Sequence, residues 1–231
     1  MNKQLNTALA ALFLATASMT VSAAENENWY GYVGMQNNEL DVNTSSLENS
    51  GLTVDKKDTG FHFGAGYKMN NNLSFEMGYL DIGKASIGTG TMSATASGVG
   101  TVGGSSYSYS ADLAGTADAT VESDGYTLGG IYSVPMADKL EGFLKAGMYF
   151  WDAEAKVTGT ITDGTLTIDG TAYTAGAYDV AGLSKSGSDL YIGLGGSYEL
   201  SPELSLRADY TKYEVWEEDV NVTGLTLVSK F

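Results

Sequence analysis

The sequence predicts an all-β fold: an eight-stranded antiparallel up-and-down transmembrane β-barrel with short periplasmic turns and long extracellular loops. Three observations carry this prediction. Apolar and polar residues alternate with period two, aromatic residues recur near the ends of the alternating segments, and short connections between segments alternate with long ones. Period two places successive side chains on opposite faces of a strand, so each segment has one apolar and one polar face. A soluble β-sandwich gives no reason for connection lengths to segregate in this way.

Eight segments show this alternation along the chain. The clearest is 60–69, in which Phe61 and Phe63 share one face while His62 and Lys68 lie on the other. An even number of strands brings both termini of the chain to the short-turn end, and it lets the first and last strands pair so that no edge stays open. The expected strands are 29–36, 60–69, 73–79, 126–134, 140–151, 189–199, 204–211 and 225–231.

The connections differ in length and composition. Turns of about four residues join the second strand to the third, the fourth to the fifth and the sixth to the seventh. Segments 86–121 and 156–187 are rich in Gly, Ser, Thr and Ala, and we expect strands prolonged beyond the membrane with mobile tips; for 86–121 disorder is the alternative. Residues 160–168 read as a hairpin with Asp163-Gly164 as its turn. The last connection is shorter and lies around 214–219.

The N-terminus has the features of a secretory signal. A positive start is followed by an apolar run and then by the small residues Ser22, Ala23 and Ala24. The run is too short and too rich in Ala and Thr for a membrane helix, which would be the alternative. We therefore expect residues 1–24 to be a signal peptide cleaved after Ala23 or Ala24, and residues 25–231 to form a single barrel domain exported to the outer membrane of a Gram-negative bacterium.

Composition narrows the possible functions. Glycine accounts for 30 of 231 residues and tyrosine for 15, whereas proline occurs twice and cysteine is absent. Without cysteine, disulfides, thiol catalysis and cysteine-based metal sites are excluded. The formal net charge of −16 disfavours nucleic acid as a partner, because phosphate backbones are also anionic.

The apolar faces carry aromatic residues mostly near the strand ends. Such residues form two girdles at the interfaces of a membrane barrel, where an apolar ring with a polar edge is favoured. The expected interfacial aromatics are Trp29, Tyr67, Phe75, Tyr79, Tyr132, Phe150, Tyr198 and Tyr210.

These residues together carry a resemblance to a known family. The opening Trp29-Tyr30, FHFGAGY at 61–67, FEMGY at 75–79, YELSPELSLRADY at 198–210 and the terminal Phe231 resemble the eight-stranded transmembrane domain of OmpA-like outer-membrane proteins. Members with a second domain grip peptidoglycan through it, whereas the present chain stops at its last strand, so the resemblance implies no cell-wall tether. Leu225, Leu227 and Phe231 resemble the C-terminal signal that the barrel-assembly machinery reads.

The polar faces carry the charged residues that alternation points into the lumen. They are His62, Glu76, Glu141, Lys145, Asp189, Arg207 and Asp209. Charges buried in so narrow a barrel must pair. The resemblance implies that Glu76, Lys145 and Arg207 form an ion-pair cluster that plugs the lumen. One interpretation is a satisfied polar core; the other is a gate whose pairs exchange partners and open a water path.

Other candidate chemistry is weak. His62 is the one histidine, and no serine or aspartate in its motif would make it a general base. Acidic residues at 214–219 and the tips at Asp163 and Asp169 match no calcium-loop spacing. We therefore expect no catalytic residues, no metal and no cofactor.

Three functions follow in order of preference. The first is a structural outer-membrane protein whose long loops are available to surface ligands, the second is a small gated channel for ions or small solutes, and the third, a lipid-modifying enzyme, lacks a nucleophile–base pair. The partners we expect are outer-membrane lipid and lipopolysaccharide, the barrel-assembly machinery and surface ligands of the loops, but not nucleic acid.

Overall fold

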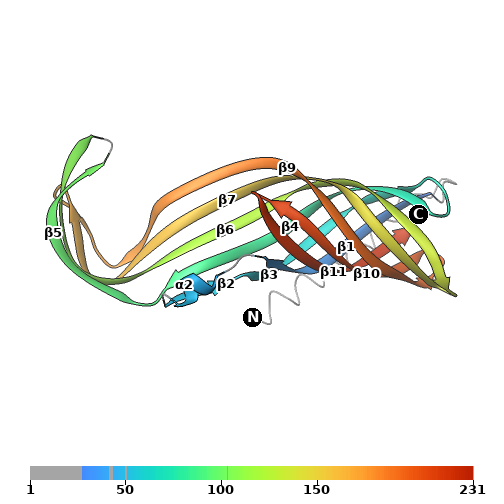
Figure 1. Cartoon of the computed structure of the whole chain (residues 1–231), viewed down its shortest axis with the longest axis horizontal. Coiled ribbons are helices and arrows are strands. Elements are labelled where there is room, and N and C mark those ends of the chain that lie inside the picture. The colour runs from blue at the N-terminus through green and yellow to red at the C-terminus, as the bar shows by residue number, and fades with distance from the viewer. Residues whose placement is uncertain (1–27, 42–43, 50, 103, 231) are drawn as a thin grey trace.

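A computed structural model describes residues 28–230 except 42–43, 50 and 103 (Figure 1). The signal peptide predicted for 1–24 and the terminal Phe231 lie outside the described residues. The elements are β1 Trp29–Leu40, α2 Ser45–Asn49, β2 Leu52–Asp55, β3 Lys57–Lys68, β4 Leu73–Thr89, β5 Met92–Val102, β6 Ser105–Ala137, β7 Leu140–Ile168, β8 Thr171–Tyr173, β9 Gly176–Ser201, β10 Leu204–Val215 and β11 Glu218–Lys230.

Eight of the strands form a closed antiparallel ring. The order β1-β3-β4-β6-β7-β9-β10-β11 follows the chain, and β11 then pairs with β1 from Tyr30↔Lys230 to Leu40↔Val220. Closure gives every strand of the ring two partners, so the ring has no open edge. The predicted eight-stranded up-and-down barrel is confirmed.

The alternation of faces is also as predicted. On β7, Tyr149 is completely buried inside the ring, whereas Leu144 points outward and is 60% exposed. On β9, Ile192 is 66% exposed while its neighbour Tyr191 is buried. The apolar face therefore surrounds the barrel on the outside, and polar, aromatic and aliphatic side chains line the inside.

Three ring strands continue far beyond the others. The strand β6 has 33 residues, β7 has 29 and β9 has 26, whereas β1, β3 and β10 have 12 each. At about 3.3 Å per residue, β6 is roughly 110 Å long, about three times what a membrane crossing needs. Together with β5 and β8, these strands form a curved sheet that reaches away from the barrel (Figure 1). We call residues 87–119 and 157–181 the extension. The prediction that strands are prolonged beyond the membrane in these segments is confirmed.

The hairpin predicted at residues 160–168 is wrong. The strand β7 runs through Asp163-Gly164, which face Ala114 and Leu113 of β6, with a register shift beside them. The turn forms instead at Asp169-Gly170, where both residues have positive φ (46° and 81°), as a two-residue hairpin requires. Ser108 of β6 donates backbone and hydroxyl hydrogen bonds to the Asp169 carboxylate, which anchors this turn.

Two local features were not expected from the sequence. The connection between β1 and β3 contains the short helix α2 and the strand β2, which pairs with β4. The last connection is confined to Trp216 and Glu217, both at positive φ (55° and 69°), because Val215 already pairs with Glu218. In the described part of the chain, no helix has the length and apolar character needed to cross a membrane.

Candidate functional site: the barrel lumen

The inward side chains of the ring stack in layers along the lumen. The ionic layer comprises Glu76, Lys145, Arg207 and Asp209, with His62 beside them around a cavity of about 40 Å³. Toward the long-loop end follows the tyrosine layer, formed by Tyr149, Tyr191 and Tyr213.

The first ion pair of the ionic layer joins β4 to β10 across the lumen. Arg207 Nη1 lies 2.7 Å from Glu76 Oε1, and the Tyr30 hydroxyl donates to the same oxygen at 2.8 Å. The guanidinium carbon lies 5.8 Å from the centre of the Tyr30 ring and 5.4 Å from that of Phe143. Both charged side chains are largely buried: 14% of the Arg207 side chain and 13% of the Glu76 side chain are exposed. Removing either partner would leave an uncompensated buried charge.

The second pair joins β7 to β10. Lys145 Nζ lies 2.5 Å from Asp209 Oδ2, and the Thr211 hydroxyl donates to the same oxygen at 2.8 Å. Lys145 reaches past the intervening strand β9 at Gly193, where a Cβ would come within 2.9 Å of the lysine chain. The group predicted as Glu76, Lys145 and Arg207 is therefore two separate pairs, and Asp209 is the partner of Lys145.

His62 is held between two neutral side chains. Its Nδ1 lies 2.9 Å from Gln36 Oε1 and its Nε2 lies 2.8 Å from the Thr226 hydroxyl. A Cβ at Gly34 would lie 2.6 Å from the imidazole, so the glycine provides the space that the ring occupies. Although a hydroxyl stands next to the imidazole, Thr226 is only 1% exposed and a substrate has no access to it.

Two predicted lumen charges lie outside the ionic layer. Glu141 lines a separate cavity of about 260 Å³ at the short-turn end, which Arg207 also borders. Asp189 accepts a hydrogen bond of 2.7 Å from the Trp151 indole nitrogen. The structure thus brings five of the seven predicted residues together and places these two in other layers.

The tyrosine layer was not singled out from the sequence. The Tyr213 ring centre lies 5.4 Å from that of Tyr149 and 5.1 Å from that of Tyr191. All three are at most 7% exposed and pack with Leu80 and other aliphatic side chains. Their sequence parity matches that of the charged inward residues on the same strands, and this was the signal available. The three rings pack together inside the ring of strands, on the long-loop side of the ion pairs.

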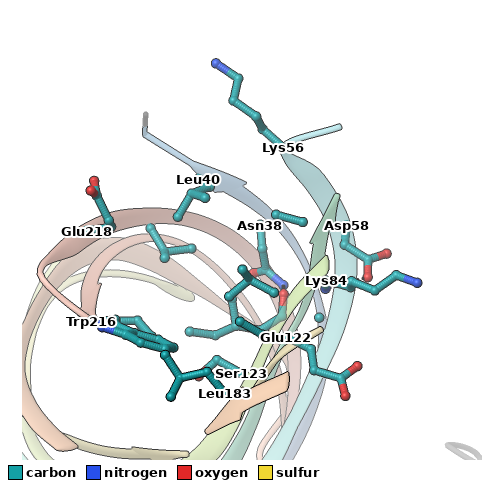
Figure 2. A pocket seen from close by; sticks show the side chains of 17 residues that line it. Asn38, Leu40, Lys56, Asp58, Lys84, Glu122, Ser123, Leu183, Trp216 and Glu218 are labelled. Atoms are coloured by element: carbon teal, nitrogen blue, oxygen red, sulfur yellow. Dashed lines mark hydrogen bonds between the residues drawn. The ribbon is translucent and has the colours of Figure 1, made fainter. Parts of the chain in front are cut away.

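A larger cavity opens beyond the tyrosine layer at the long-loop end. This mouth cavity has a volume of about 380 Å³ and is lined mostly by aliphatic side chains and Trp216. Figure 2 shows Trp216 and Leu183 on one side of it, with Asn38 extending toward it from the opposite wall. Several charged side chains stand at its border, and Lys84, Glu122 and Lys56 extend away from its centre (Figure 2).

The barrel matches a known protein family over nearly its whole length. A model of the family described as "Outer membrane protein beta-barrel domain" matches residues 9–229. The chain belongs to this family. The predicted family and the predicted location in the Gram-negative outer membrane are confirmed. The short-turn end of this outer-membrane barrel is therefore periplasmic, and the extension and mouth cavity are extracellular.

Solved structures of similar fold include three from Gram-negative bacteria. Ail of Yersinia pestis is 13% identical, covering 89% of this chain and 99% of its own, with a TM-score of 0.48. Neisserial surface protein A is 16% identical, covering 88% and 97%, with a TM-score of 0.46. The N-terminal barrel domain of Pseudomonas aeruginosa OprF is 12% identical, covering 88% and 98%, with a TM-score of 0.42. No curated protein matches the chain.

The expected interfacial aromatics lie on the outer face of this barrel. Neighbouring strands bring them together, as in the edge-to-face contact of Trp29 with Tyr67 at 5.1 Å. Toward the extracellular end, Tyr79 lies 5.8 Å from Tyr126, a 67% exposed residue that the prediction did not include. The others, Phe75, Tyr132, Phe150, Tyr198 and Tyr210, are between 45% and 54% exposed.

The C-terminal assembly signal stays a prediction, and the structure describes two of its three residues. Leu225 and Leu227 of the expected assembly signal lie on the outer face of β11, and Leu225 is 54% exposed. Among the described residues, no group of three or more His, Cys, Asp or Glu side chains could hold a metal ion.

Proposed function

We propose that the protein is a non-enzymatic, membrane-anchored scaffold that presents the extension to surface ligands outside the cell. The observation that carries this proposal is the continuation of β6, β7 and β9 as one sheet for many residues beyond the barrel. Loops that merely connect strands do not need paired backbones over this length. A rigid sheet instead holds side chains at a fixed distance from the membrane.

The packed lumen supports an anchoring rather than a conducting barrel. Two ion pairs and a layer of buried tyrosines follow one another along the lumen, and the cavity within the ionic layer holds only about 40 Å³. In an eight-stranded barrel the interior is just wide enough for side chains to fill. On this view Glu76, Arg207, Lys145 and Asp209 stabilise the barrel.

The charge of the extension indicates the chemistry of its ligands. Residues 87–119 and 157–181 contain five aspartates and no lysine or arginine. At its base, the pKa of Lys156 is raised because the Glu154 carboxylate accepts its hydrogen bond and adds negative charge. A second cavity of about 390 Å³, lined by side chains such as Leu113, Ile161 and Tyr178, lies within the extension. Neutral or basic protein surfaces fit this character, whereas polyanions would be repelled.

A trimmed variant tests the proposal. Replacing 87–119 and 157–181 by tight turns cuts the sheet at one level, because Ile87 pairs with Ala119, Ala119 with Val157 and Val157 with Ala181. Cells that display the full chain should adhere to surfaces coated with fibrillar collagen, which is neutral to basic, and cells with the trimmed barrel should not. Heparin-coated beads should capture neither. Equal adhesion by both variants, or capture by heparin, would refute the proposal.

The alternative is a small gated channel. The observation in its favour is that the two ion pairs lie side by side around one cavity, so that exchange of partners is geometrically conceivable. Single-channel recording distinguishes the two functions, because a scaffold has no conductance to lose.

Two further partners belong to this proposal. Outer-membrane lipid and lipopolysaccharide would contact the apolar face between the aromatic girdles, where residues such as Leu144 and Leu194 are exposed. The barrel-assembly machinery would read the C-terminal strand through Leu225, Leu227 and Phe231 during insertion.

A further inference from the structure

The mouth cavity has a lining unlike the rest of the lumen. Below it, the inward side chains include the ion pairs and the packed tyrosine rings, whereas the cavity walls are built mainly by Leu40, Ile82, Val121, Leu183, Val215 and Val220. These residues come from β1, β4, β6, β9, β10 and β11, so the apolar lining surrounds the opening. An apolar cavity open to extracellular water is unfavourable when empty, because water there lacks hydrogen-bond partners.

One polar group in this apolar wall lacks a partner. Asn38 is 3% exposed, and its Nδ2 donates to the Ile82 carbonyl oxygen at 2.5 Å. This bond fixes the orientation of the amide, because the reversed amide would place two acceptor oxygens against each other. Asn38 Oδ1 is therefore a buried acceptor, and it has no hydrogen-bond donor within the described residues. Such atoms are rare and costly in folded proteins, so the arrangement points to a donor supplied from outside.

Trp216 is held over the same cavity by a strained turn. It has a φ of 55°, which is unusual for a bulky residue, and it is followed by Glu217 at 69°. Pairing of Val215 with Glu218 leaves only these two residues to reverse the chain. The half-buried indole packs against the aliphatic cluster, and Lys185 Nζ lies 5.5 Å above the ring centre. The turn thus places a large flat apolar surface opposite Asn38 (Figure 2).

We propose that the mouth cavity binds a small neutral molecule with an apolar body and a single hydroxyl or amide N–H group. The body packs against Trp216 and Leu183, and the hydroxyl or N–H donates to Asn38 Oδ1. That oxygen is almost fully covered, so the side chains that cover it move slightly on binding. The cavity of about 380 Å³ lies in the size range of small-molecule sites. The proposal is independent of the role of the extension, because residues 87–119 and 157–181 do not line this cavity.

A pair of brominated probes tests the proposal on the full chain refolded in lipid nanodiscs. 6-Bromo-2-naphthol has the hydroxyl donor, 2-bromo-6-methoxynaphthalene lacks it, and bromine quenches tryptophan fluorescence on contact. We expect saturable quenching by both probes, with the naphthol about tenfold tighter, since one hydrogen bond to a buried acceptor contributes about that factor. Substituting Trp216→Phe should remove most of the saturable part, because Trp29 and Trp151 do not line the cavity.

Two asparagine variants test whether Asn38 is the acceptor or whether any Asn→Leu change on β1 alters binding. Asn38→Leu should remove the preference for the naphthol, whereas Asn37→Leu, the same change on the outer face, should leave the preference unchanged. If Asn38→Leu fails to fold, Leu183→Lys serves instead; Leu183 is 60% exposed, and the charge should weaken both probes at least tenfold. Equal affinities for the two probes, non-saturable quenching, or binding unchanged by Leu183→Lys would overturn the proposal.

Discussion

A charge on the outer face of β9 tests the membrane-facing assignment of the barrel. Leu194 is 58% exposed, pairs with Leu144 on one side and Tyr210 on the other, and lies four residues from the periplasmic girdle residue Tyr198. Exposure of an aliphatic side chain between two girdles means contact with lipid. The variant Leu194→Arg places a guanidinium in the hydrocarbon layer, where the cost is about 2–4 kcal/mol near the midplane. That corresponds to a roughly 30-fold to 1,000-fold shift of the unfolding equilibrium.

The free energy of unfolding in lipid vesicles measures this effect. Urea titrations followed by tryptophan fluorescence, with the gel mobility of unheated samples as a check of the folded fraction, give the difference between variant and wild type. Val180→Arg is the matched control: it is on the same strand and 68% exposed, but it lies in the extension, so its effect should stay within about 0.5 kcal/mol. Equal destabilisation by the two arginines would refute the assignment of faces and depth.

Three further outcomes follow from the structure. Arg207→Met should lower the free energy of unfolding by about 3–5 kcal/mol because it strands the buried Glu76 carboxylate, and the double variant with Glu76→Leu should recover most of the loss; a double variant as unstable as the single one would contradict this. Gly34→Ala should cost about 1–3 kcal/mol by pushing on the His62 ring, as urea titration would show, and no loss would mean that the ring has room to move. Deleting Phe231 should slow assembly in cells, measured as folded protein in outer-membrane fractions, far more than refolding in detergent; equal slowing would remove the role of an assembly signal.

The alternation of residues predicted the faces of the strands, because faces depend only on parity, and the aromatic strand ends and connection lengths then predicted the membrane barrel. The same parity placed Lys145 and Asp209 inside but could not pair them. Their contact crosses β9 at Gly193, and it depends on the relative stagger of strands that are not neighbours in the ring. Which charges meet is therefore a property of the assembled sheet.

The position of a turn is a second feature that the sequence alone could not predict. Asp163-Gly164 and Asp169-Gly170 are the same dipeptide, and local preference cannot choose between them. Pairing of β7 with β6 decides between them. Residues on both sides of Gly164 already have partners on β6, so the chain can reverse only after Ile168.

The mouth cavity was missed for a related reason. Asn38 and Trp216 are far apart in sequence, and they line one cavity only when β1 and β11 close the ring.

Conductance of the refolded protein in a planar lipid bilayer tests the central claim most directly. The wild type should be compared with Glu76→Ala and Arg207→Ala, which remove the two sides of one lumen ion pair. In the proposed scaffold the tyrosine layer keeps the lumen closed without that ion pair, so we expect no conductance steps in any of the three proteins. Discrete openings in the wild type, growing in frequency or size in the variants, would contradict it and establish a gated channel.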